Sequence, residues 1–264
     1  MAARQQSIPV PIFDAFEIAL AQECALELWR GFDFESNSLK EKSDEELLHS
    51  FSGSFNAILQ NPNTTTRITE YEVRQLARVA KIKAFYRSAI STDFLAGISS
   101  VEIGVTQDVH KWRGRTVGAT RKSHALNAVI NVARNFVTNS GPSLNGNYRV
   151  PLASRLLFYA VPEMPIFSFS NPLAKKLKLQ TRPQAAYPFF FDLMYKGIWT
   201  NRRRLSMLNV PTSSLLSVAQ QNSLERSRWW TRRVLDLALL NHFNLASPKI
   251  SLIQAARANA PNYR

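Results

Sequence analysis

The chain of 264 residues has a formal net charge of +14, one cysteine, 13 prolines and only 9 glycines. A single cysteine excludes an internal disulfide and any zinc site built from several cysteines, and no apolar run reaches the roughly 20 residues of a membrane-spanning helix. The N-terminus lacks the apolar core of a secretory signal peptide, so we expect a cytoplasmic protein with no membrane contact.

The charge is divided unevenly along the chain. Residues 1–72 contain 12 acidic and five basic side chains, a net charge of −7. Residues 73–264 contain seven acidic and 28 basic side chains, a net charge of +21. Positive charge interleaved with aromatic residues favours a polyanionic partner, for which we expect double-stranded DNA. RNA or an acidic protein is the weaker alternative. We therefore divide the chain into an acidic N-terminal helical segment, residues 1–72, and a basic helical body, residues 73–264.

Helical spacing of apolar residues runs through the first half of the chain. We expect a helix over residues 13–29, a second from the capping box at residues 43–46 to near Gln60, and a third from the capping box at residues 69–72. A further helix is expected over residues 121–138. No stretch shows sustained alternation of period two, so the sequence predicts an all-α fold.

A loop between glycines, residues 107–118, combines cations with an aromatic residue and an acid. Such a loop is a candidate for contacts with phosphates and for base stacking, although a basic surface turn would have the same composition. Its candidate residues are Asp108, Lys111, Trp112, Arg113 and Arg115.

The stretch from residue 150 to residue 179 predicts two helices joined by a crossing that contains two prolines. The first, residues 152–160, is apolar with one embedded cation, Arg155. The second begins at an N-cap, Ser170 or Asn171, with Pro172 as the first helical residue. Free N–H groups at such a helix end attract anions, and Lys175 and Lys176 follow.

The C-terminal part of the chain is aromatic and basic. The strongly aromatic stretch over residues 183–200 includes Asp192 and Trp199, and we expect its residues 189–191 to lie in the core. A capping box at residues 222–225 predicts a helix to residue 240, followed by a weaker final helix. Four further cations of this part are candidates for phosphate contacts, namely Arg202, Arg203, Arg204 and Arg228.

Three stretches carry a resemblance to a known family: VPEMPI at residues 161–166, LAKKL at residues 173–177 and RWWTRRVLDLALL at residues 228–240. Their spacing resembles that of the helix-hairpin-helix DNA glycosylase superfamily, in particular bacterial proteins with the 8-oxoguanine glycosylase fold. The resemblance covers roughly residues 121–243. It implies a helical bundle in two lobes that flips a base out of DNA and excises it.

Two positions depart from the family pattern. Ser170 stands where the family has its catalytic aspartate, and Arg155, or less favourably Ser154, stands where some members have a lysine. Arginine stays protonated and is a poor nucleophile, so a lyase step through it is disfavoured. We therefore expect a monofunctional enzyme in which another carboxylate acts, or in which Ser170 and Asn171 orient water.

Asp108, Glu163 and Asp192 are the candidate acids, and we rank Asp192 slightly ahead of Asp108 because its aromatic surroundings could bury it. Base flipping also requires a wedge or an aromatic pocket. The aromatic residues available for it are Phe167, Phe169, Trp112 and Trp199. Neither a cofactor nor a metal is expected, since the four histidines are scattered.

The leading hypothesis is thus a DNA glycosylase that excises a modified or damaged base. Some relatives of this fold remove modified bases from phage DNA, so the resemblance also suggests an antiviral role. A non-catalytic DNA-binding protein of the same fold is the alternative.

Overall fold

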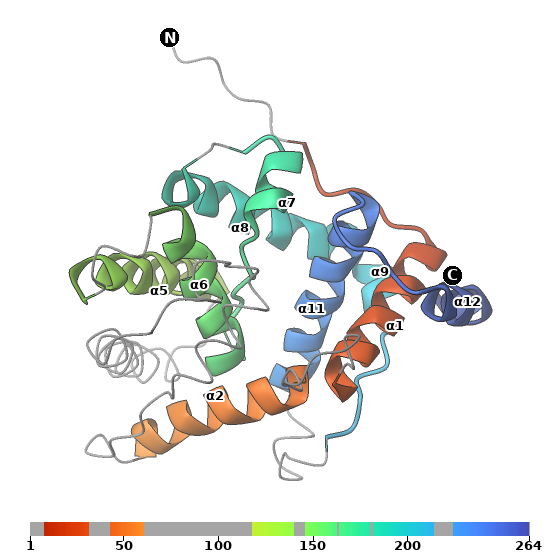
Figure 1. Cartoon of the computed structure of the whole chain (residues 1–264), viewed down its shortest axis with the longest axis horizontal. Helices are drawn as coiled ribbons and strands as arrows, with labels where there is room; N and C mark the ends of the chain where they lie inside the picture. Colours follow the sequence, from red (N-terminus) through yellow and green to blue (C-terminus); the bar gives the residue numbers. More distant parts are fainter. Residues whose placement is uncertain are drawn as a thin grey trace, which may run out of the picture. The chain divides into compact units, whose positions relative to one another are not determined.

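The computed structural model describes residues 8–31, 43–60, 118–139, 146–162, 164–179, 182–213 and 224–263. Throughout these ranges the regular structure is helical and no strand occurs, which confirms the predicted all-α class (Figure 1). The chain forms two compact units, the first made of residues 1–45 and 169–264, the second of residues 46–168. The boundary predicted at residue 72 lies outside the described residues.

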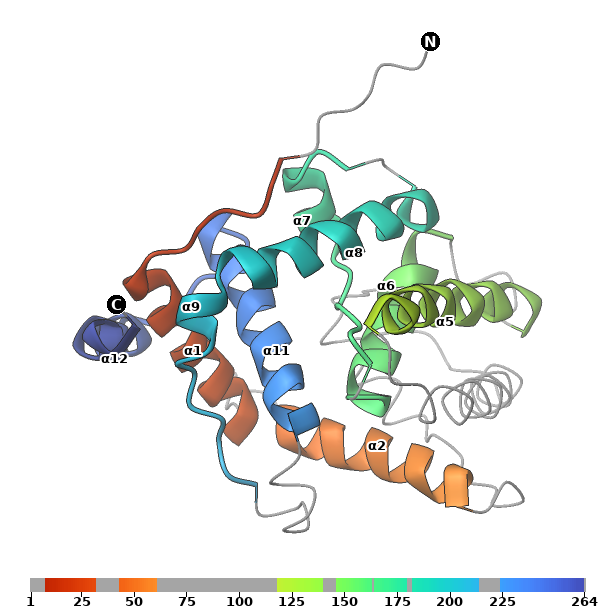
Figure 2. The ribbon, with the colours of Figure 1, turned by 180° about the vertical axis from the view of Figure 1, so that it is seen from behind.

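In the first unit, α1 (Ala15–Arg30) packs along α11 (Leu224–His242), α12 (Ile250–Asn259) and the short 3-10 helix η2 (Ala260–Tyr263). Both views show α1 and α11 side by side (Figures 1 and 2). A capping box starts α1: the Asp14 carboxylate accepts a hydrogen bond from the Glu17 backbone N at 2.7 Å, and the Glu17 carboxylate accepts one from the Asp14 N at 2.8 Å. A helix of the acidic segment therefore packs against helices of the basic segment.

Three tryptophans fill the interface between α1 and α11. The ring of Trp29 lies 5.9 Å from that of Trp229 and 5.8 Å from that of Trp230, measured between centroids. The indole N–H of Trp230 donates to the Gln22 side-chain oxygen at 3.2 Å, and the Gln22 amide donates to the Asn209 carbonyl at 2.8 Å. Because a buried indole N–H and a buried amide both need partners, this chain of bonds fixes α11 and the 206–213 segment on α1.

The remaining helices of the first unit are α7 (Asn171–Lys176), α8 (Pro183–Thr200) and α9 (Arg202–Leu205). Phe190 and Phe191 are buried, but Phe189 is 55% exposed, so the expectation that all three lie in the core is wrong for Phe189. Successive helical residues turn by about 100°, so three consecutive side chains cannot all face one core.

An extended N-terminal strap, residues 8–13, crosses the first unit. The backbone N of Ile8 donates to the Leu177 carbonyl at 3.2 Å. Further along the strap, Val10 lies so close to α8 that a Cβ added at Gly197 would be 2.8 Å from its Cγ1. Glycine at position 197 is therefore what lets the strap approach the helix.

The second unit contains most of α2 (Asp44–Gln60), together with α5 (Gly118–Asn139) and α6 (Gly146–Ala160), and α5 packs against α6. The predicted start and end of α2 are confirmed. The helix predicted over residues 152–160 begins earlier, at Gly146, and passes through Pro151, so residues 146–148 are helical although their composition predicts a loop.

Candidate nucleic-acid interface

The glycine-bounded loop lies outside the described residues. This applies to its candidates Asp108, Lys111, Trp112, Arg113 and Arg115, and also to Glu163. The site is therefore built from the remaining candidates.

The two departures from the glycosylase pattern lie in different units. Arg155 is buried on α6 in the second unit, whereas Ser170 is the half-buried N-cap of α7 in the first. Ser170 has the extended backbone of an N-cap, but its side chain makes no capping hydrogen bond. The predicted N-cap is thus confirmed, although Asn171 and not Pro172 is the first helical residue.

The helix end that Ser170 caps is a weaker anion site than the sequence suggests. α7 has only six residues, so few peptide dipoles add along its axis. Pro172 in its first turn has no N–H to offer. Lys175 and Lys176 are exposed in the last turn of this helix, where they remain available to an anion by themselves.

The aromatic candidates separate into buried and exposed side chains. Phe167 is buried in the second unit, and Phe169 is buried in the first. The ring of Phe169 meets those of Tyr187 and Phe190 edge-on, at centroid distances of 5.9 Å and 5.1 Å, as core aromatic rings do. Trp199, in contrast, is 59% exposed at the end of α8.

Asp192 lies exposed on α8. The expectation that its aromatic surroundings bury it is therefore wrong, because the buried side of α8 takes Phe190, Phe191 and Met194 while Asp192 points to the other side. Other exposed residues lie three residues before it and four and seven residues after it, which is the spacing of one helix face, namely Phe189, Lys196 and Trp199.

Several cations lie close to Trp199 in the sequence, where α8 passes into α9. The guanidinium carbon of Arg202 lies 5.7 Å from the centroid of the Trp199 ring, within the range of a cation–π contact. Lys196 and Arg203 are exposed, and Arg204 is half-buried. We call Lys196, Trp199, Arg202 and Arg203 the aromatic–basic face.

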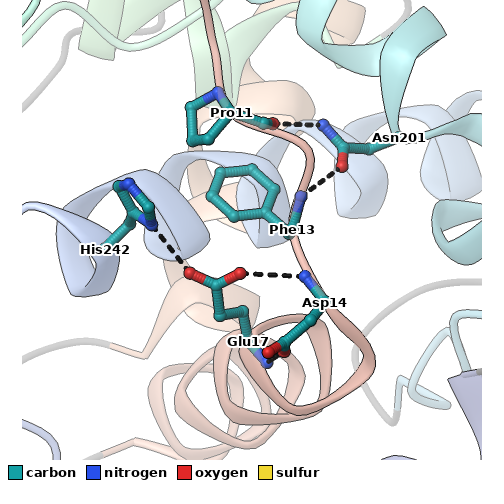
Figure 3. A network of polar contacts seen from close by, with 6 residues as sticks. All are labelled: Pro11, Phe13, Asp14, Glu17, Asn201 and His242. Carbon is teal, nitrogen blue, oxygen red and sulfur yellow. Dashed lines mark hydrogen bonds and ion pairs between the residues drawn. The ribbon is translucent and has the colours of Figure 1, made fainter.

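Asn201 holds this face in place. Its buried side chain accepts a hydrogen bond from the Phe13 backbone N at 2.8 Å and donates to the Pro11 carbonyl at 3.0 Å (Figure 3). The same amide also donates to the Gly197 carbonyl at 3.0 Å. The strap, the end of α8 and the start of α9 therefore meet at one amide. The sequence reasoning missed Asn201, whose position between Thr200 and three arginines offers only a weak signal.

A second pair of arginines, on α11, lies inside the protein and not on its surface. Arg232 and Arg233 are buried. The Arg233 guanidinium holds both carboxylate oxygens of Asp44, at 2.6 Å and 3.2 Å, and lies 3.5 Å from Asp236. Arg228, at the start of the same helix, is exposed.

Comparison of the chain with protein-family models, with curated proteins and with solved structures found no match. In the described ranges no helix is both long and apolar enough to cross a membrane, and no three histidine, cysteine or acidic side chains gather as a metal site would require. Function therefore has to be inferred from the charge, exposure and geometry of the side chains above.

Proposed function

We propose that the protein binds DNA through the aromatic–basic face. The observation that carries this proposal is the exposed Trp199 ring with the Arg202 guanidinium 5.7 Å from its centroid and with Arg203, the next residue, also exposed. Arginine and lysine side chains bind phosphate oxygens, and an exposed indole offers a surface for a base. The net charge of +21 over residues 73–264 supports a polyanionic partner.

Excision of a base is the second candidate function, and the position of Asp192 favours it. Asp192 lies seven residues before Trp199, two helical turns away on the exposed side of α8. A carboxylate beside a bound strand can stabilise the positive charge that develops on a deoxyribose as its base leaves. This candidate keeps the glycosylase hypothesis, with Asp192 in the role that Ser170 cannot fill.

Binding is tested with a labelled DNA fragment over a series of salt concentrations. We expect the double variant Arg202→Gln, Arg203→Gln to bind about tenfold more weakly and to lower the slope of log affinity against log salt by roughly 1–2. The matched control is Arg257→Gln, which removes an exposed cation from α12 and should change neither quantity. Equal affinity of the double variant and the natural chain would refute the proposed face.

Base excision needs a separate assay. The chain is incubated with phage DNA that carries modified cytosines, with chemically damaged DNA and with unmodified DNA, and abasic sites are counted. We expect abasic sites in a modified or damaged substrate, and we expect Asp192→Asn to abolish them while DNA affinity is kept. If no substrate acquires abasic sites, the glycosylase candidate fails and the binding proposal stands.

A further inference from the structure

We infer that the aromatic–basic face, extended along α8 to Phe189, recognises unpaired nucleotides, so that its ligand is single-stranded and not duplex DNA. This inference rests on the proposed DNA binding and adds the form of DNA that is bound. It comes from three observations: the exposure of two aromatic rings, the place of the cations around one of them, and the spacing of the rings along the helix.

The exposure of Trp199 is unusual within this chain. The other tryptophans that the structure describes, Trp29, Trp229 and Trp230, are at most 3% exposed, whereas Trp199 is 59% exposed. Phe189, on the same helix, is 55% exposed. Large exposed aromatic side chains that recur on one surface mark a contact site.

The cations next to Trp199 favour a nucleic acid over an apolar partner. Lys196 lies three residues before Trp199, and Arg202 and Arg203 lie three and four residues after it. The contact with Arg202 orients the indole ring but still leaves more than half of this side chain open. An oriented aromatic surface beside phosphate-binding groups is the arrangement by which proteins bind single strands.

The spacing of Phe189 and Trp199 fits a short strand. They are ten residues apart on α8, which corresponds to about 15 Å along the helix axis. At about 3.4 Å for each stacked nucleotide, this distance spans roughly four nucleotides. The bases of a duplex are stacked on one another and expose only their edges, so two separate ring surfaces are useful only to a strand whose bases are free.

The exposed cations set the path of the strand. Lys196, Arg202 and Arg203 are the exposed cations of this face. The backbone of a bound strand therefore runs along Lys196, Arg202 and Arg203, and its bases turn toward the rings.

The test uses the full chain and three fluorescein-labelled probes of one sequence, about 15 nucleotides long: the DNA strand, the DNA duplex and the RNA strand. Fluorescence anisotropy should give an affinity for the DNA strand about tenfold above that for the duplex. Trp199→Ala should lower affinity for the strand about tenfold, while Trp199→Phe keeps it within about threefold because a ring is retained. Ile250→Ala, which removes an apolar side chain that is 75% exposed on α12, is the matched control and should have no effect.

Each outcome decides a different point. Equal or tighter binding of the duplex, or full affinity of Trp199→Ala, would overturn the inference while leaving the arginine contacts intact. Failure of the natural chain to bind any probe would overturn the proposed function as well. Tighter binding of the RNA strand would overturn the choice of DNA. Should Trp199→Ala not fold, Phe189→Ala takes its place, and full strand affinity of that variant would likewise refute the extended face.

Discussion

Two stretches of the chain look alike in sequence and differ completely in the folded protein. Trp199-Thr-Asn-Arg-Arg ends α8 and begins α9, and Trp230-Thr-Arg-Arg lies within α11. Around Trp199 the ring and two arginines are exposed. Around Trp230 the ring is buried against α1, and Arg233 is buried against Asp44.

The difference shows what separates a structural cation from one that can meet a ligand. A guanidinium that leaves water must be neutralised and hydrogen-bonded, and Asp44 supplies both functions to Arg233 from a position 189 residues away in sequence. Arg202 and Arg203 stay hydrated at the surface, where they can exchange water for phosphate. Basic and aromatic composition alone therefore marks both stretches as candidate contacts for DNA, although only the stretch at Trp199 is accessible to a polyanion.

The largest effect is expected from removing the partner of the buried arginine. Asp44→Ala leaves the Arg233 charge with a much weaker partner, Asp236 at 3.5 Å, and should lower the free energy of unfolding by about 3–5 kcal/mol. Urea denaturation measures this loss. Arg203→Ala, in the exposed stretch, is the control and should change stability by less than about 0.5 kcal/mol. A loss below about 1 kcal/mol for Asp44→Ala would contradict the contrast between the two stretches.

The next effect concerns the amide that supports the exposed stretch. Asn201→Ala removes three hydrogen bonds and leaves the Phe13 N–H without its acceptor, so we expect a loss of about 2–3 kcal/mol in the free energy of unfolding. DNA affinity should fall as well, because the strap and α9 lose their common anchor. Asn209→Ala removes an exposed asparagine side chain from the following segment and serves as the control. Unchanged stability of Asn201→Ala would rule out the anchoring role.

A smaller effect is expected where the strap approaches the same helix. Alanine normally stabilises a helix relative to glycine, but the added Cβ of Gly197→Ala would lie 2.8 Å from Val10 Cγ1. We therefore expect a net loss of about 1–2 kcal/mol. Adding Val10→Ala to this variant should recover part of the loss, which a double-mutant cycle in thermal or urea denaturation would measure. Additive effects of the two substitutions would exclude the contact.

Local signals in the sequence predict much of the fold and little of the site. The capping box at residues 43–46 and the proline at position 172 place helix starts within a residue or two, because caps and prolines act on their own backbone. The pairing of Asp44 with Arg233 and the anchoring of the strap by Asn201 depend on contacts between distant segments. No periodicity within one helix encodes such contacts.

The choice of Asp192 illustrates the same limit. An aromatic stretch predicts burial on average, but the side of the helix that faces the core decides it residue by residue. Phe190 and Phe191 take that side, and Phe189 and Asp192 do not. The glycine-bounded loop lies outside the described residues, so its candidates stay predictions.

The smallest effect concerns two groups of the first unit that titrate at alkaline pH, Tyr263 and Cys24. Burial, and after it the charge of Glu23, raise the pKa of Tyr263 above its ordinary value of 10.0. Burial is also the main cause that raises the pKa of Cys24 above 9.0, followed by a partly opposing hydrogen bond from Asn241 and by the charges of Glu27 and Glu23. Each group is neutral below its ordinary pKa, so its contribution to stability is complete there and is lost as the pH rises through the raised value.

The free energy of unfolding should therefore decline as the pH rises above about 9. Tyr263→Phe keeps the ring and removes the phenol, so its stability should decline less steeply above about pH 10 than that of the natural chain. Cys24→Ala should reduce the decline that begins near pH 9. If neither variant flattens the curve, the alkaline loss of stability has an origin other than Tyr263 and Cys24.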